Sequence, residues 1–146
     1  MSEERSAYFR RLAELLGGGG EIRDVDRWHE QILVGLPFEA VENVKSRASL
    51  TDADMARLLG IGEATLRRAR ASRSKLDSTV GDRLYRLSKA IAVAEEVLGS
   101  EAGAISWLRR AQPGLGGRVP LELLRTHAGA DRVETLLRRI DYGVYT

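Results

Sequence analysis

The sequence predicts an all-α fold, in which a helix–turn–helix region is joined by a long helix to a small helical C-terminal domain. Two observations support this prediction. Apolar residues recur three and four positions apart in nearly every segment of the 146 residues, the period of an amphipathic helix. Glycines and prolines separate these segments, as they do at helix ends. We divide the chain into a helical arm with a glycine hinge (1–20), a helix–turn–helix domain (21–88) and a C-terminal domain (89–146).

The composition predicts a cytoplasmic globular protein. Apolar residues make up 43% of the chain, an ordinary share for a globular domain. The chain has no cysteine, which excludes disulfides and thiolate chemistry and fits a reducing compartment. No apolar run approaches the roughly 18 residues of a membrane span, and residues 1–11 lack the apolar core of a signal peptide. We therefore expect no membrane partner.

The first forty-six residues predict three short helices. Glu3–Leu16 is amphipathic, and the four glycines that follow form a hinge, so this helix packs either on its own chain or on a partner. Asp24–Val34 has near-helical spacing, although its last three residues also suit a short strand. Trp28 is interpreted as a core anchor. Pro37 is suited to begin a third helix that ends near Ser46.

Residues 51–70 have the spacing of a helix–turn–helix. Thr51 is a good N-cap, and Asp54 stands at the capping-box position three residues later. Ala56 is small where the second helix must cross. Gly60 suits the left-handed turn, and Leu66 fills the angle between the two helices.

The second helix of this pair is the candidate DNA-binding element. Residues 51–75 hold six basic and three acidic side chains, most of the excess in or just after this helix. Glu63 is a mild objection, because a carboxylate near phosphate is repelled unless it accepts from a cytosine amine. The alternative is a packing unit with a solvated basic face. The candidate DNA-binding residues are Glu63, Ala64, Thr65, Arg67, Arg68 and Arg70.

Leu76–Gly99 predicts the longest helix, which joins the two ends of the chain. Its apolar residues are spaced four, three, four, three and four apart, which is three heptads of a and d positions. This pattern suits both an ordinary core helix and a seam between two copies. On the second interpretation, Leu84, Leu87 and Ile91 line a homodimer seam.

The C-terminal region combines glycine and proline breaks with an apolar stripe. Another short helix, Glu101–Ala111, places Trp107 inward as a core residue. In the final helix, Val133, Leu136, Leu137 and Ile140 fall on one face. The chain then ends on YGVYT, with apolar and aromatic residues where a terminus is usually small and polar. We expect this tail to be buried against something.

Two blocks of this region carry a family resemblance. LGGRVPLELL (115–124) and AGADRVETLLRRIDYGVY (128–145) resemble the C-terminal toxin-binding domain of bacterial Xre/MbcA/ParS antitoxins. Residues 52–71 resemble the Xre-like DNA-binding motif at Ala56, Gly60 and Leu66. Members of this family pair with RES-domain toxins, which attack NAD.

The resemblance implies an antitoxin that inhibits a RES-domain toxin, binds its own promoter DNA, and forms a homodimer alone and a hetero-oligomer with the toxin. It implies that Tyr142–Thr146 approach the toxin's active site. Tyr142 is suited to anchor this tail on its own domain. The expected toxin-binding residues are Leu115, Gly116, Leu121, Leu124, Tyr142, Gly143, Val144, Tyr145 and Thr146.

We expect neither catalysis nor a cofactor. The sequence contains no nucleophile motif with a positioned base and no GxGxxG after a strand. His29 and His127 are distant from each other and have no cysteines with which to complete a metal site. The alternative to an antitoxin is a transcription regulator whose C-terminal domain only dimerises or senses a ligand.

Overall fold

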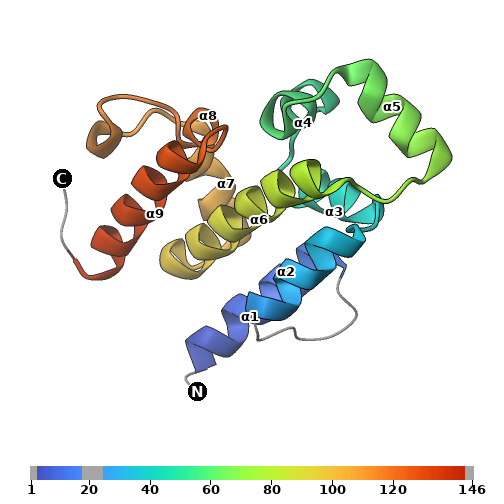
Figure 1. Ribbon diagram of the computed structural model, residues 1–146. Helices are drawn as coiled ribbons and strands as arrows, with labels where there is room; N and C mark the ends of the chain where they lie inside the picture. The colour runs from blue at the N-terminus through green and yellow to red at the C-terminus, as the bar shows by residue number, and fades with distance from the viewer. Residues whose placement is uncertain (1–2, 18–24, 144–146) are drawn as a thin grey trace.

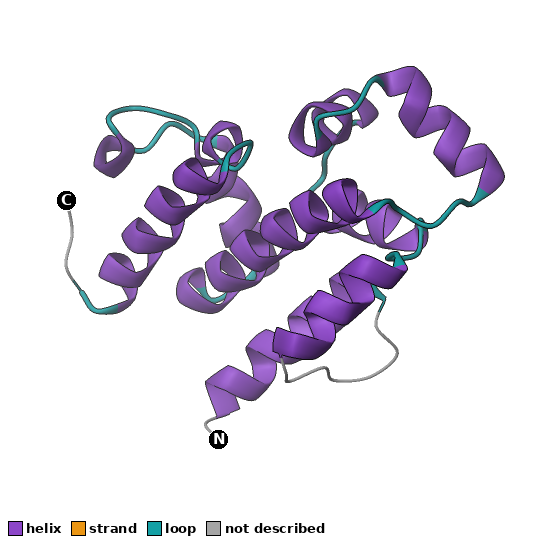
Figure 2. Ribbon diagram, viewed as in Figure 1, coloured by secondary structure: helices purple, strands orange, loops and turns teal. Residues whose placement is uncertain are grey.

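The computed structural model describes residues 3–17 and 25–143, and these residues form helices joined by loops (Figures 1 and 2). The expected all-α class is confirmed. An isolated bridge between Gln112 and Arg118 is the sole β-type pairing among the described residues. In chain order the elements are α1 (Glu3–Leu16), α2 (Val25–Val34), α3 (Glu39–Arg47), α4 (Asp52–Leu59), α5 (Glu63–Ser72), α6 (Ser78–Leu98), α7 (Glu101–Arg109), the 3-10 turn η1 (Pro113–Leu115), α8 (Pro120–Leu123) and α9 (His127–Asp141).

The helix–turn–helix forms as its sequence predicts. Thr51 and Asp54 make a reciprocal capping box, in which each side chain accepts from the other residue's backbone N–H at 3.0 Å. Gly60 ends α4 in the left-handed conformation, with φ of +69°. Ala56 and Leu66 are buried where α4 and α5 cross. The cap, the left-handed turn and the small and apolar residues at the crossing therefore account for the geometry of the helix–turn–helix.

Helix α6 is the central element of the molecule. It packs against α1, α2, α4, α7 and α9, and Figure 1 shows it running between α9 on one side and α1 and α2 on the other. The side chains of Leu84, Leu87 and Ile91 are 0%, 2% and 1% exposed. These three residues form the core of a single chain, so the interpretation that they line a seam between two copies is corrected.

Helix α1 packs on its own chain rather than standing apart. Leu12, Leu15 and Leu16 are buried, and α1 lies against α3 and α6. The α6 residue Glu95 is 1% exposed, and Arg47 of α3 donates to its carboxylate at 2.8 and 2.9 Å. Arg11 of α1 lies 3.5 Å from the same group. A buried charge of this kind requires such partners, so the cluster holds α1, α3 and α6 in place.

Helices α2 and α3 form close to their predicted positions. Residues 25–34 form a helix throughout, so the strand alternative is wrong for residues 32–34. Helix α3 begins at Glu39, two residues after Pro37. Trp28 is buried, as expected, and lies 6.0 Å from the ring of Tyr85.

The C-terminal helices build a small core on the far end of α6. Trp107 is buried, as expected, with Val133, Leu136 and Leu137 of α9. Thr126 caps α9 by accepting from the N–H of Gly129 at 2.9 Å. The described part of the chain contains no helix with the length and apolar character of a membrane span.

Candidate functional site

Helix α5 presents five of its six predicted DNA-binding residues to solvent. Glu63, Ala64, Thr65, Arg67 and Arg68 are all exposed, whereas Leu66 is buried and fixes the helix against α4. Arg68 donates to the hydroxyl of Thr65 at 3.3 Å. The guanidinium groups of Arg67 and Arg68 make no ion pair with the described residues. The exposed face of α5 therefore offers two uncompensated cations.

Arg70 has a structural role instead. It donates to both carboxylate oxygens of Asp52 at 2.8 and 3.0 Å and to Glu42 at 2.7 Å. Its guanidinium also lies 5.8 Å from the ring centre of Phe38. The hydrogen bonds from Arg70 hold the pKa of the Asp52 carboxyl well below its ordinary value. Arg70 is thus occupied in joining α5 to α3 and α4, and its assignment as a DNA-binding residue is corrected.

The three leucines predicted to contact a toxin lie inside the C-terminal core. Leu115, Leu121 and Leu124 are 1%, 6% and 2% exposed. A partner cannot reach side chains that are already packed, so their assignment to a contact surface is corrected. They stabilise the domain that carries the surface. Gly116, by contrast, is exposed at the end of η1.

The end of α9 exposes the first residues of the predicted tail. Tyr142 was predicted to anchor the tail on its own domain. Its side chain is instead 79% exposed, so this prediction is wrong. Gly143 follows with φ of +76°. The remaining predicted contacts, Val144, Tyr145 and Thr146, lie outside the described residues.

A groove lies between η1 and α9. Its volume is about 320 Å³, and its lining residues are Gly114, Asp131, Arg132, Thr135, Leu136 and Arg139. Arg132, Thr135, Arg139 and Tyr142 are exposed and spaced three, four and three apart, so they form one outward stripe of α9. The first three were not predicted, because the apolar periodicity marks only the buried face of α9. The same periodicity, applied to the opposite face, would have found them.

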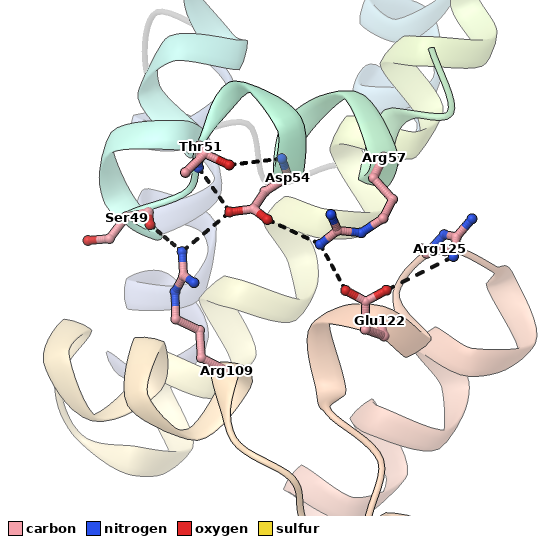
Figure 3. A network of polar contacts seen from close by, with 7 residues as sticks. All are labelled: Ser49, Thr51, Asp54, Arg57, Arg109, Glu122 and Arg125. Atoms are coloured by element: carbon pink, nitrogen blue, oxygen red, sulfur yellow. Dashed lines mark hydrogen bonds and ion pairs between the residues drawn. The ribbon is translucent and has the colours of Figure 1, made fainter. Parts of the chain in front are cut away.

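A polar network joins the helix–turn–helix to the C-terminal helices (Figure 3). The guanidinium of Arg57 on α4 lies 3.1 Å from Asp54 and 2.8 Å from Glu122 on α8. Arg109, at the end of α7, donates to the carbonyl of Ser49 and lies 3.6 Å from Asp54. A hydrogen bond from the backbone N–H of Thr51 lowers the pKa of Asp54. Asp54 therefore takes part in the capping box of α4 and also connects the two halves of the molecule.

No group of three or more histidine, cysteine or acidic side chains is arranged as a metal site within residues 3–17 and 25–143. His127 is exposed and lies 3.9 Å from Asp131, its neighbour one turn along α9.

Comparison with known proteins assigns a family to both halves. Residues 93–143 match the model of the antitoxin Xre/MbcA/ParS C-terminal toxin-binding domain, and residues 27–89 match that of the antitoxin Xre-like helix-turn-helix domain. The chain belongs to the Xre/MbcA/ParS antitoxin family. The resemblance stated from residues 52–71, 115–124 and 128–145 is confirmed.

Three curated relatives of this antitoxin family are each described as antitoxin Xre. The protein from Yersinia enterocolitica is 29% identical over 118 residues, which are 80% of each chain. The Photorhabdus laumondii protein is 27% identical over 75% of each chain. The Pseudomonas putida protein is 27% identical over 79% of this chain and 71% of its own. Antitoxin relatives therefore match across most of their length.

Proposed function

We propose that this chain is the antitoxin of a type II toxin–antitoxin system in the cytoplasm, and that it neutralises a RES-domain toxin that degrades NAD or transfers ADP-ribose. The observation that carries the proposal is the exposed stripe of α9. It places two arginines beside a groove and ends on Tyr142, a large aromatic ring left 79% exposed. Aromatic and arginine side chains are the common anchors of protein interfaces.

In this proposal the stripe and the groove dock the toxin, and residues 142–146 enter its substrate site. A site for NAD offers cationic donors for the pyrophosphate and apolar walls for the flat rings. Tyr145 supplies a flat ring with a hydroxyl, which suits such apolar walls. The left-handed conformation of Gly143 lets the chain turn away from α9 towards that site.

The test is co-expression of this chain with the RES-domain protein of the adjacent reading frame. We expect the toxin alone to arrest growth and deplete NAD, and we expect this chain to relieve both effects. A chain carrying Arg132→Glu and Arg139→Glu should relieve them less, because its docking stripe is reversed in charge. If the chain never relieves the arrest, it is not the antitoxin, and a regulator whose C-terminal domain only dimerises or senses a ligand becomes the better account.

The proposal includes promoter binding by α5. Helix–turn–helix proteins place the start of the second helix in the major groove. At the start of α5, the side chains of Glu63, Ala64 and Thr65 are exposed. Arg67 and Arg68 are suited to contact phosphates. A dimer doubles the small contact that one such module makes. We therefore retain a homodimer in the proposal, but through a surface other than the buried stripe of α6.

Replacing Arg67 and Arg68 with alanine should weaken binding to the chain's own promoter. Each lost phosphate contact should reduce the slope of log affinity against log salt by about 0.9. The measurement is titration of a promoter fragment at several salt concentrations. An unmodified chain that binds no promoter fragment even at low salt would show that the helix–turn–helix is a packing unit only.

A further inference from the structure

A second basic site lies in a cleft between α4 and the C-terminal helices. Its volume is about 380 Å³. Four arginines and one glutamate supply its charged side chains: Arg57, Arg83, Arg118, Arg125 and Glu122. These residues come from both halves of the chain, so neither half contains the complete site.

The charges in this cleft are only partly compensated. Glu122 lies 2.8 Å from Arg57 and 4.0 Å from Arg125, and Figure 3 shows these two arginines approaching its carboxylate from different sides. Arg83 donates to the backbone carbonyl of Leu59 at 3.0 Å. Arg83 and Arg118 have no ion pair with any carboxylate of the described residues. The cleft therefore holds an excess of positive charge.

This excess of charge lies beside the element proposed to contact DNA. Gly60, the turn residue of the helix–turn–helix, borders the cleft. Glu63 begins α5 only three residues later. Three residues of chain reach at most about 11 Å. Figure 1 shows α4 between α8 and α5, with the α4–α5 turn joining the two regions. Each strand of a duplex carries one phosphate per about 3.4 Å of helix axis, so a few base pairs of one duplex cover that distance.

We propose that this cleft binds backbone phosphates of the same DNA that α5 contacts, and that the C-terminal domain is thus part of the DNA interface. Arginine suits this role because its planar guanidinium donates two parallel hydrogen bonds to a phosphate. Contacts of this kind fix the position of a protein on the duplex and carry no sequence information. The inference rests on the proposed DNA binding by α5, and adds a second contact to it.

The character of the cleft favours phosphates over an acidic protein segment. Protein interfaces are usually anchored by large apolar or aromatic side chains in the centre of the contact. In this cleft Leu58 is only 3% exposed and contributes to the core instead. The aromatic anchor of the C-terminal domain, Tyr142, stands at the far end of α9. The two surfaces are therefore suited to two different partners.

The experiment compares salt dependence of promoter binding for the full chain and for Arg118→Ala/Arg125→Ala. Both residues are exposed, so the variant should keep its fold and melting temperature. We expect weaker binding to promoter and scrambled duplexes alike, with a slope reduced by about two. Arg10→Ala/Arg27→Ala is the matched control, because it removes two exposed positive charges from α1 and α2, away from both proposed binding surfaces. It should leave the slope unchanged.

The outcomes separate this inference from DNA binding itself. If the unmodified chain binds no promoter, both proposals fail. If it binds, and Arg118→Ala/Arg125→Ala keeps the same slope, the cleft inference alone is overturned. Equal losses in the variant and the control would also overturn it, since net charge alone would then explain them. Loss of toxin capture with unchanged DNA binding would assign the cleft to the protein partner instead.

Discussion

At the residue scale, Gly129 shows how closely α8 and α9 approach each other. Gly129 lies in the first turn of α9, and a Cβ added there would stand 1.9 Å from the carbonyl oxygen of Leu123. The other two nearest atoms also belong to the Leu123 backbone. Backbone cannot swing aside as a flexible side chain does. Glycine is therefore required at this position by close contact rather than by a positive φ.

Gly129→Ala should separate α8 from α9 and destabilise the protein by about 1–3 kcal/mol, the usual cost of overpacking. For a chain of this size that is a fall of several degrees in melting temperature. Thermal unfolding followed by circular dichroism measures it. Gly62→Ala is the control, because its added Cβ would meet nothing closer than 3.9 Å. Equal melting temperatures for both variants would contradict the close approach.

The arginines of α5 show what charge counting predicts and what it misses. Arg67, Arg68 and Arg70 lie within four residues and look alike in the sequence. Only the fold brings Glu42 and Asp52 to Arg70, from 28 and 18 residues away. Ion pairing across such separations has no local signal. The sequence could therefore predict a basic helix, but not which of its charges are free.

At the element scale, local rules were sufficient for the helix–turn–helix and insufficient for α6. Each signal of the helix–turn–helix acts within a few residues, and all three are confirmed: Thr51 caps α4, Gly60 makes the turn, and Leu66 is buried between the two helices. The heptad spacing of α6 also predicted a helix correctly. It could not predict a partner, because a/d residues bury equally well against the same chain or a second one.

The apolar periodicity of α6 also did not predict that the charged residue Glu95 is buried. Glu95 follows Ala94 and precedes Glu96, so the sequence suggests a solvated acidic edge. In the structure its carboxylate is buried, and it binds Arg47 from 48 residues away. The hydrogen bonds that Arg47 donates to the Glu95 carboxylate are the main reason that the pKa of Arg47 lies above its ordinary value. Truncating either partner would leave the other charge uncompensated.

At the scale of the whole molecule, the exposed face of α5 and the outer stripe of α9 belong to opposite halves, both built on α6. The sequence predicted these two regions and their order, and the family comparison confirms the resemblance on which they rest. The outer stripe, the groove beside η1 and the basic cleft were not predicted. Each combines residues from separate elements, and their proximity depends on how helices pack.

The central claim is that residues at the end of the chain block the toxin's substrate site while the α9 stripe and its groove hold the complex together. Burying Tyr145 should contribute about 2–3 kcal/mol, or roughly thirty- to a hundredfold in affinity. The remaining surface should keep a complex assembled without it. Blocking and docking are therefore separable by truncation.

The most direct test measures NAD consumption by the toxin in complex with a chain that lacks Val144–Thr146, with a pull-down to verify assembly. The full-length chain is the reference. We expect the truncated complex to assemble and to recover much of the toxin's activity, because its substrate site is open. Full inhibition by the truncated chain in an assembled complex would contradict the account and would place the inhibitory contact elsewhere on the antitoxin.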